Sequence, residues 1–309
     1  MNRSPKLQRV KSLPPPPARP EDANKGTFGR VLVVAGSHGM SGAACLAGLG
    51  ALRGGAGLVT VASPSGIVPI VAAVEPSYLT LPLPEDATGK IAQAARTTLE
   101  SALASQTTIA VGPGLGQSPE LAGLVRWLFD AVDRPGVFDA DALNLLSAHP
   151  ATLKSRARRS DPVPPRVLTP HPGEFARLIS SDIPTVEKNR ESLSVQFAAE
   201  HKLVLVLKGH RTLITDGRRI AVNSTGNSGM ATGGCGDVLT GLIAALLGQK
   251  MPAFEAAQLG AYLHGLAGDL AAKSISEPAL VASDLTRWLG MAWLTFLRQT
   301  GRQTGRRPR

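Results

Sequence analysis

The chain of 309 residues is 43% hydrophobic and 18% charged, a balance that excludes disorder throughout and allows a large core. Its net charge of +10 does not indicate a nucleic-acid surface, because the excess lies in residues 1–20 and 298–309, and the body between them has 23 basic and 23 acidic residues. Plentiful small aliphatic residues and few aromatics favour an α/β layer fold.

The two ends and the cysteines set further limits. We expect a basic, proline-rich arm at residues 1–23 and a basic tail at residues 298–309, both disordered. Two cysteines, Cys45 and Cys235, cannot form a disulfide framework, which fits a reducing compartment. No signal peptide precedes the prolines, and the longest apolar runs are about half of the ~20 residues that a membrane span needs. We therefore predict a cytoplasmic protein without a membrane segment.

From residue 30 onward, short aliphatic runs alternate with helical stretches rich in Ala and Leu, the pattern of βαβ units. Strands that lead into helices are predicted in residues 30–55, 107–132, 135–146, 165–179, 202–217 and 227–241, with a further strand at 57–64. Residues 153–165, which are polar and Pro-rich, are interpreted as a surface loop rather than a domain linker. Polar residues gather directly after the strands, where ligands bind in open α/β sheets.

The stretch NSGMATGGCGDVLTG, residues 227–241, sets several glycines and one carboxylate before an apolar helix. The amides of Gly233, Gly234, Cys235 and Gly236 can converge on an anion, and the helix start adds roughly half a positive charge, so a phosphate fits there. Asp237 would then accept a proton or hold a cation, or it merely caps the helix. Cys235 is interpreted as a small loop residue rather than a nucleophile.

Three further motifs follow predicted strands. KGHRT places Lys208 after an apolar run, where it either binds a ligand or reaches solvent. TPHPGE holds His171 between two prolines, with Glu174 nearby. DADALN presents three polar side chains, Asp139, Asp141 and Asn144. Of these, Asp141 either lies near a metal-bound phosphate or caps the next helix. We find no dedicated metal cage and no Walker motif, and a Mg²⁺ carried by the phosphates of a nucleotide would need few protein ligands and leave little trace in the sequence.

The chain resembles the ADP/ATP-dependent NAD(P)H-hydrate dehydratases of the ribokinase-like superfamily in seven motifs: NKGTFGRVLVVAGS, GAACLAGLGALRGGAGLVTV, GPGLG, DADALN, TPHPGE, KGHRT and NSGMATGGCGDVLTG. The resemblance covers residues 24–297 and implies a three-layer α/β/α sandwich with a central, mostly parallel sheet. It also implies a metabolite repair reaction, the dehydration of the S epimer of hydrated NADH or NADPH. In that reaction ADP or ATP phosphorylates the ring hydroxyl, and elimination of phosphate restores NAD(P)H.

The same resemblance assigns expected roles to individual residues. Asp237 is implied to be the catalytic base. The adenine nucleotide is expected to contact Lys208, Gly209, His210, Arg211, Thr212 and Gly236. The hydrate is expected to contact Ala43, Gly114, His171 and Asp237. The glycine loop at Gly233, Gly234, Cys235 and Gly236 would form the anion hole, and the secondary candidates are Asp141, Asn144 and Glu174. The relatives further imply a homo-oligomer, often a tetramer.

The chain departs from the family pattern at three positions, since His, Pro and Ser or Thr are usual where it has Asn24, Ser228 and Cys235. Only some two dozen residues precede the motifs, so we expect neither an epimerase domain nor epimerase activity. The alternative function is a small-molecule kinase of the same superfamily, such as a vitamin or hydroxymethylpyrimidine kinase, which would share the glycine loop and Asp237. A catalytically silent nucleotide-binding protein and a nucleic-acid-binding protein are less favoured.

Overall fold

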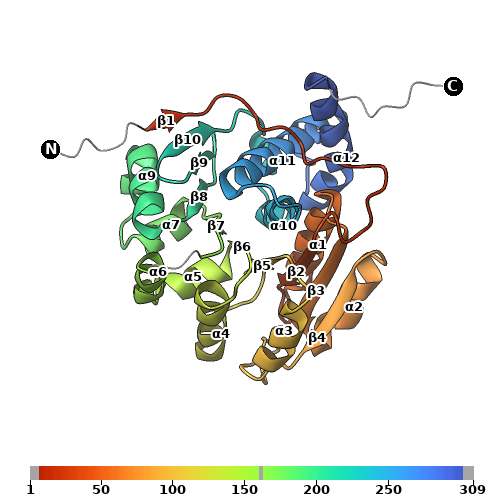
Figure 1. The fold of residues 1–309 in the computed structure, drawn as a ribbon, viewed down its shortest axis with the longest axis vertical. Helices are drawn as coiled ribbons and strands as arrows, with labels where there is room; N and C mark the ends of the chain where they lie inside the picture. Colours follow the sequence, from red (N-terminus) through yellow and green to blue (C-terminus); the bar gives the residue numbers. More distant parts are fainter. Residues whose placement is uncertain (1–6, 160–162, 302–309) are drawn as a thin grey trace.

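A ten-stranded β-sheet forms the middle layer of the computed structural model, which describes residues 7–159 and 163–301 (Figure 1). The strand order is β1-β10-β9-β8-β7-β6-β5-β2-β3-β4. β9 is antiparallel to both of its neighbours, β8 and β10, and the other neighbouring pairs are parallel. The strands are β1 (Gln8–Arg9), β2 (Arg30–Val34), β3 (Leu58–Pro64), β4 (Leu79–Leu83), β5 (Thr108–Val111), β6 (Gly136–Phe138), β7 (Arg166–Leu168), β8 (Val204–Leu207), β9 (Leu213–Thr215) and β10 (Arg219–Val222).

Helices cover both faces of this sheet. They are α1 (Ser41–Arg53), η1 (Ser65–Ile67), α2 (Val68–Val74), α3 (Ala95–Leu103), α4 (Pro119–Asp130), α5 (Asp141–Ser147), α6 (Pro150–Ala157), α7 (Pro172–Leu178), α8 (Ile183–Lys188), α9 (Arg190–His201), η2 (Ser228–Met230), α10 (Cys235–Gly248), α11 (Ala253–Ile275) and α12 (Ala282–Gln299).

Alternate strand residues pack against opposite helical layers. Val31 and Val33 share a core with α1, α10, α11 and α12, whereas Leu32 and Val34 share the second core with α3, α4, α5, α7 and α9. This period of two is expected of strands that are buried on both faces. The predicted three-layer α/β/α sandwich with a mostly parallel sheet is confirmed.

Glycines set the position of α10 by allowing it to cross α1 at very short range. A Cβ atom on Gly241 of α10 would lie less than 3.0 Å from the Ala47 carbonyl oxygen, and a Cβ on Gly50 of α1 would meet the Val238 carbonyl oxygen equally closely. The two backbones are therefore in direct contact, and no side chain separates them. This crossing directs the first turn of α10 toward the edge where β6, β7 and β8 end.

Three predicted elements are wrong in the structure, and the first is the strand expected in residues 227–241, where the short helix η2 precedes α10 and no strand forms. Residues 202–217 were expected to lead from a strand into a helix, but they form β8 and β9, an antiparallel pair that continues into β10. The β-branched residues after Lys208 suit a strand, and the turn at residues 208–212 reverses the chain. Residues 153–165 are not a continuous loop, because residues 153–157 belong to α6, and residues 160–162 lie outside the described part of the chain.

The prediction of a disordered arm is wrong for residues 7–23, which lie along the folded body (Figure 1). β1 pairs with β10, the side chain of Gln258 donates a hydrogen bond to the Ser12 carbonyl (3.0 Å), and the Arg19 guanidinium lies 4.1 Å from the Phe28 ring centroid. The arm composition could not reveal this order, because the order depends on β10 offering an otherwise unpaired edge. In the predicted tail, α12 extends to Gln299. Residues 1–6 and 302–309 lie outside the described ranges.

Candidate active site

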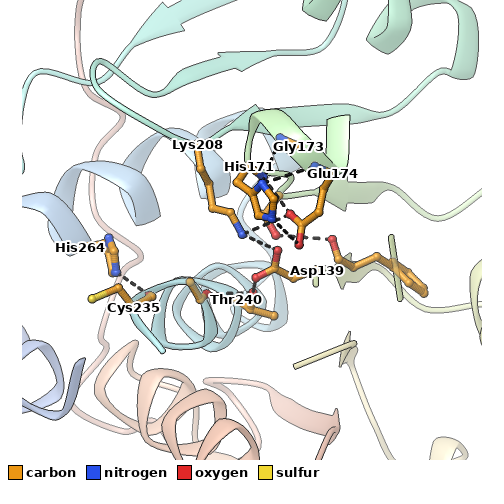
Figure 2. Close-up of polar contacts among 11 residues, drawn as sticks. Asp139, His171, Gly173, Glu174, Lys208, Cys235, Thr240 and His264 are labelled. Carbon is orange, nitrogen blue, oxygen red and sulfur yellow. Dashed lines mark hydrogen bonds and ion pairs between the residues drawn. The ribbon is translucent and has the colours of Figure 1, made fainter. Parts of the chain in front are cut away.

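Polar side chains from three neighbouring parallel strands meet at one edge of the sheet. Asp139 directly follows β6, His171 precedes the helix after β7, and Lys208 directly follows β8. Because parallel strands end at the same edge, these side chains lie together, and Figure 2 shows them gathered against α10. Of the motifs that the sequence singled out, DADALN, TPHPGE, KGHRT and the glycine stretch therefore converge on one site.

A buried ion pair lies at the centre of this site. The Lys208 ammonium is 2.6 Å from Oδ1 of Asp139, and the hydroxyl of Thr240 on α10 donates to Oδ2 of the same carboxylate at 2.8 Å (Figure 2). Burial alone would lower the pKa of Lys208, but the carboxylates of Asp139 and Glu174 outweigh it and hold that pKa above its usual value. Lys208 therefore stays charged and points into the site rather than into open solvent.

Asp237 lies in the first turn of α10 and does not cap the helix. The N-cap residue of α10 is Gly234, and no side chain there makes a capping hydrogen bond. Burial raises the pKa of Asp237 to about 7, and repulsion from Asp139 adds to this effect while Lys208 opposes it. A carboxyl group with a pKa near neutrality is suited to accepting a proton and releasing it again.

The glycine loop before Asp237 offers free backbone donors. Gly234 has a φ of 90°, a left-handed conformation that favours glycine. The amides of Asp237 and Val238 donate to the Gly234 carbonyl, whereas those of Gly234, Cys235 and Gly236 make no backbone hydrogen bond with another described residue. Free N–H groups at a helix start are the usual setting for an anion.

His264 contacts the same turn at Cys235, the first residue of α10. Burial raises the pKa of the Cys235 thiol to about 11, so the thiol stays protonated and is not an activated nucleophile. The Nε2 atom of His264 on α11 is 2.8 Å from the Cys235 carbonyl oxygen (Figure 2). Burial lowers the pKa of His264 to about 4, so the ring is neutral and its Nε2–H donates to that carbonyl.

His171 and Glu174 form a capping box at the start of α7. Nδ1 of His171 accepts hydrogen bonds from the amides of Gly173 (3.0 Å) and Glu174 (3.4 Å), and the Glu174 carboxylate accepts one from the His171 amide (2.8 Å). Because Nδ1 is an acceptor, the proton of the neutral ring is on Nε2, which lies 3.3 Å from Glu174. Burial and the nearby Lys208 lower the pKa of His171, while burial raises that of Glu174.

The remaining predicted residues divide into two groups. Gly114 lies against Ala43, since a Cβ on Gly114 would be 2.8 Å from the Ala43 Cβ, and Asp141 accepts a hydrogen bond from the Gly116 amide at 2.8 Å. These contacts bring the GPGLG loop, α1 and α5 together beside the site. Asn144 does not join them, because its side-chain oxygen accepts a hydrogen bond from Arg177 (2.9 Å) on the surface.

A cavity of about 860 Å³ opens between α11, the turn after β8 and the segment after β10. All six residues expected to contact the nucleotide line it, and so does His171, whereas Ala43, Gly114 and Asp237 are outside its lining. The other lining residues are Asn223, Ser224, Thr225, Gly226, Asn227, Ser228, Met230, Ala231, Thr232, Cys235, Leu239, Ala261, His264, Gly265 and Glu277. The hydroxyl of Ser228, one of the departures from the family pattern, hydrogen-bonds to Glu277.

Sequence reasoning gave no role to four residues that hold the site together. They are Asp139, Thr240, His264 and Asp269, which accepts hydrogen bonds from the Gly226 amide (2.9 Å) and the Asn227 side chain (3.1 Å). Thr240 had a signal, since it is a hydroxyl in an otherwise apolar run one turn after Asp237. His264 and Asp269 had none, because their partners lie on distant parts of the chain.

Metal-binding clusters and membrane-spanning helices are both absent from the described residues, 7–159 and 163–301. Among them, no group of three or more His, Cys, Asp and Glu side chains is arranged to hold a metal ion. In the same ranges, no helix combines the length and apolar character that crossing a membrane requires.

Comparisons with known proteins agree with the geometry. The sequence model of the NAD(P)H-hydrate dehydratase family matches residues 31–289. The chain is 44% identical over 275 residues to the bifunctional NAD(P)H-hydrate repair enzyme of Moorella thermoacetica, covering 88% of this chain but only 51% of that protein. It is 39% identical to the ADP-dependent (S)-NAD(P)H-hydrate dehydratase of Neisseria meningitidis, covering 88% of each.

A solved structure gives the same result. The ADP/ATP-dependent NAD(P)H-hydrate dehydratase of Bacillus subtilis, co-crystallised with ATP and Mg²⁺, aligns with a TM-score of 0.74 and 32% identity over 91% of this chain and 94% of that one. The chain thus spans about half the length of the bifunctional relative and nearly all of the Bacillus protein. On the family match, which covers most of its length, the chain belongs to the NAD(P)H-hydrate dehydratase family.

Proposed function

We propose that this protein uses ADP or ATP to dehydrate the S epimer of hydrated NADH or NADPH, giving NAD(P)H, phosphate and AMP or ADP. One observation carries the proposal: the first turn of α10 has free amides and Gly236 on the wall of the cavity, and it also holds Asp237 with a pKa near neutrality. Hydrogen-bond donors for a phosphoryl group and a proton acceptor therefore lie on the same turn. Phosphoryl transfer to an alcohol requires this juxtaposition.

The reaction follows from what these groups can do. In its ionised form, Asp237 accepts the proton of the ring hydroxyl as that oxygen attacks the terminal phosphorus. The free amides at Gly234, Cys235 and Gly236 stabilise the negative charge on the phosphoryl oxygens in transit. The hydroxyl oxygen thereby becomes part of a phosphate ester, a much better leaving group. Phosphate then departs with the electrons of the C–O bond, and loss of a ring proton restores the dihydropyridine.

The nucleotide is proposed to occupy the cavity lined by Lys208, Gly209, His210, Arg211, Thr212 and Gly236. Mg²⁺ is proposed to enter with the nucleotide phosphates, whose charge it would neutralise when bound. The hydrate is proposed to lie on the other side of Asp237, beside Ala43 and Gly114, with His171 at the boundary of the two substrates.

Hydrated NADH tests the function directly. The enzyme is mixed with both epimers of the hydrate and with ADP, ATP or no nucleotide, while absorbance of the reduced nicotinamide and release of phosphate are followed. We expect recovery of NADH that requires a nucleotide and stops when the S epimer is exhausted. Absence of recovery with both nucleotides contradicts the proposal. Transfer of phosphate to a vitamin-like alcohol, without any NADH formed, would instead support the kinase alternative.

Asp269→Asn is expected to weaken nucleotide binding more than it slows the reaction. Asp269 accepts from two donors in the segment that lines the cavity, and an asparagine offers one acceptor and sets an amino group against the other donor. Loss of about 1–2 kcal/mol raises the KM for ADP by about 5- to 30-fold, with kcat within about threefold of wild type.

Steady-state kinetics with saturating hydrate measure this effect. Glu100→Gln is the matched control, because it removes the charge of an exposed carboxylate on α3 and should leave both constants unchanged. An unchanged KM in Asp269→Asn would contradict the proposed place of the nucleotide.

We also infer that the chain forms a homo-oligomer, as its family resemblance implies. Exposed apolar side chains at Ile70, Val74 and Leu79 lie on α2 and on β4, which ends the described sheet, and such side chains are commonly covered by another copy. Light scattering of the purified protein tests this inference.

The predicted cytoplasmic location is supported by two unpaired, buried cysteines.

A further inference from the structure

Asp139 is too deeply buried to contact a ligand itself. Its side chain is 1% exposed, and its two oxygens are occupied by the Lys208 ammonium at 2.6 Å and the Thr240 hydroxyl at 2.8 Å. A buried carboxylate with both oxygens paired is stable only while those partners stay in place. Any effect of Asp139 on the reaction must therefore pass through Lys208, through α10 or through its own charge.

Lys208 and Asp139 lie directly against the first turn of α10. A Cβ on Gly236 would be 3.2 Å from the Lys208 ammonium and 3.4 Å from Oδ2 of Asp139. Lys208 is 20% exposed and lines the nucleotide cavity, so its ammonium lies between the buried carboxylate and the space proposed for the phosphates. Without Asp139, the flexible lysine side chain would have no partner closer than Glu174, which is 3.8 Å away.

The charged groups around Asp237 come from several elements. Asp139 and Asp141 come from the end of β6 and the start of α5, Glu174 from α7, and Lys208 from the end of β8. His264 on α11 and Cys235 on α10 are neutral, because burial holds the pKa of the imidazole low and that of the thiol high. Of the charges, Asp139 has the largest influence on the proton affinity of Asp237, and Lys208 opposes it.

We propose that Asp139 is a positioning residue for the reaction: it holds the Lys208 ammonium beside Gly236, ties that pair to α10 through Thr240, and sets the charge that Asp237 experiences. This inference rests on the proposed function. It adds a role for Asp139 to that function: this carboxylate positions the Lys208 ammonium and raises the proton affinity of the base Asp237 without contacting either substrate.

Titration of the Asp237 carboxyl by carbon NMR, assigned with Asp237→Asn, tests the proposal whether or not the chain is a dehydratase. We expect Asp139→Asn to lower the titration midpoint of Asp237 by about one pH unit or more, because it removes a negative charge and leaves Lys208 uncompensated. Lys208→Met should raise the midpoint, because the ammonium no longer offsets the negative charge of Asp139. Thr240→Val removes the link to α10 without changing charge, so the midpoint should stay within about 0.3 unit of wild type.

Kinetics complete the test for variants whose near-UV circular dichroism matches the wild type. We expect kcat of Asp139→Asn to fall by about tenfold or more at a pH where Asp237 is ionised in every variant, and Thr240→Val to lose activity without a shift of its pH profile. A purely structural role of Asp139 would lower activity in Asp139→Asn and in Thr240→Val, and the titration midpoint of Asp237 would keep its wild-type value in both. That result overturns the inference. Midpoints that move in the same direction in Asp139→Asn and Lys208→Met also overturn it. If the wild-type protein does not act on the hydrate, the proposed function is contradicted. The titration midpoints of Asp237 then still test whether Asp139 sets the charge around it.

Discussion

We expect Asp237→Asn to lower kcat of the proposed dehydration by about 10³-fold and to leave the dissociation constant of ADP within about threefold of wild type. Asparagine keeps the shape of the side chain but cannot accept the hydroxyl proton. The nucleotide cavity does not include Asp237, so its walls are unchanged. Single-turnover kinetics with the S hydrate and calorimetric titration with ADP measure the two quantities separately.

The pH profile of the wild type gives an independent control for this prediction. Burial and Asp139 raise the pKa of Asp237 to about 7, so the base is protonated below neutrality and kcat/KM should fall as pH drops through about 7. The residual activity of Asp237→Asn should not show this acid limb. A variant that keeps wild-type turnover, or a wild type with flat activity from about pH 5 to pH 8, would show that another group accepts the proton.

The same substitution should stabilise the fold, and the sign follows from the raised pKa. The folded-state pKa of Asp237 is about 7 and its ordinary value is 3.8, so the folded state favours the neutral acid and loses stability as pH rises between these values. Asparagine is always neutral and avoids that loss. The difference in Tm between variant and wild type should therefore be small near about pH 4 and largest above about pH 7. A Tm difference that is equal at both pH values would indicate that the folded state does not raise the pKa of Asp237.

The candidate site could be predicted from sequence as far as its motifs are local. The glycines before Asp237 and the prolines around His171 mark unusual backbone within a few residues, and the structure brings both motifs to the same edge of the sheet. The parts that could not be predicted depend on long-range contacts. Asp139 meets Lys208 and Thr240 across 69 and 101 residues of sequence, and nothing near Asp139 reveals which partner it has.

The fold shows the same division between local and distant causes. The alternating strands and helices around β2, β5, β6 and β7 follow from aliphatic runs and helical stretches in the sequence. The hairpin of β8 and β9 was missed because its turn lies in the KGHRT motif, whose polar residues suggested a ligand loop before a helix. The order of residues 7–23 was missed because it depends on β10, which lies about 200 residues further along the chain.

Gly241→Ala destabilises the protein by about 3 kcal/mol or more, a large share of the stability of an ordinary domain. Its Cβ would lie less than 3.0 Å from the backbone carbonyl oxygen of Ala47, and that oxygen cannot move away as a flexible side chain could. α1 and α10 must separate, and every contact along their buried seam loosens. Thermal and denaturant unfolding measure the loss. Because Asp237 belongs to the same helix, kcat should fall together with stability, even though Gly241 lies a full turn beyond the site.

Two matched variants separate this close crossing from a general effect of replacing helical glycines. Gly50→Ala adds a methyl group on the opposite side of the crossing, against the carbonyl oxygen of Val238, and should be similarly destabilised. Gly290→Ala lies in α12 with no atom within 4 Å of the added Cβ, so it should be stabilised by up to about 1 kcal/mol through helix propensity. If Gly241→Ala also gained stability, the two backbones could not be in contact, and the position of Asp237 would have to be maintained by α11 through His264 instead.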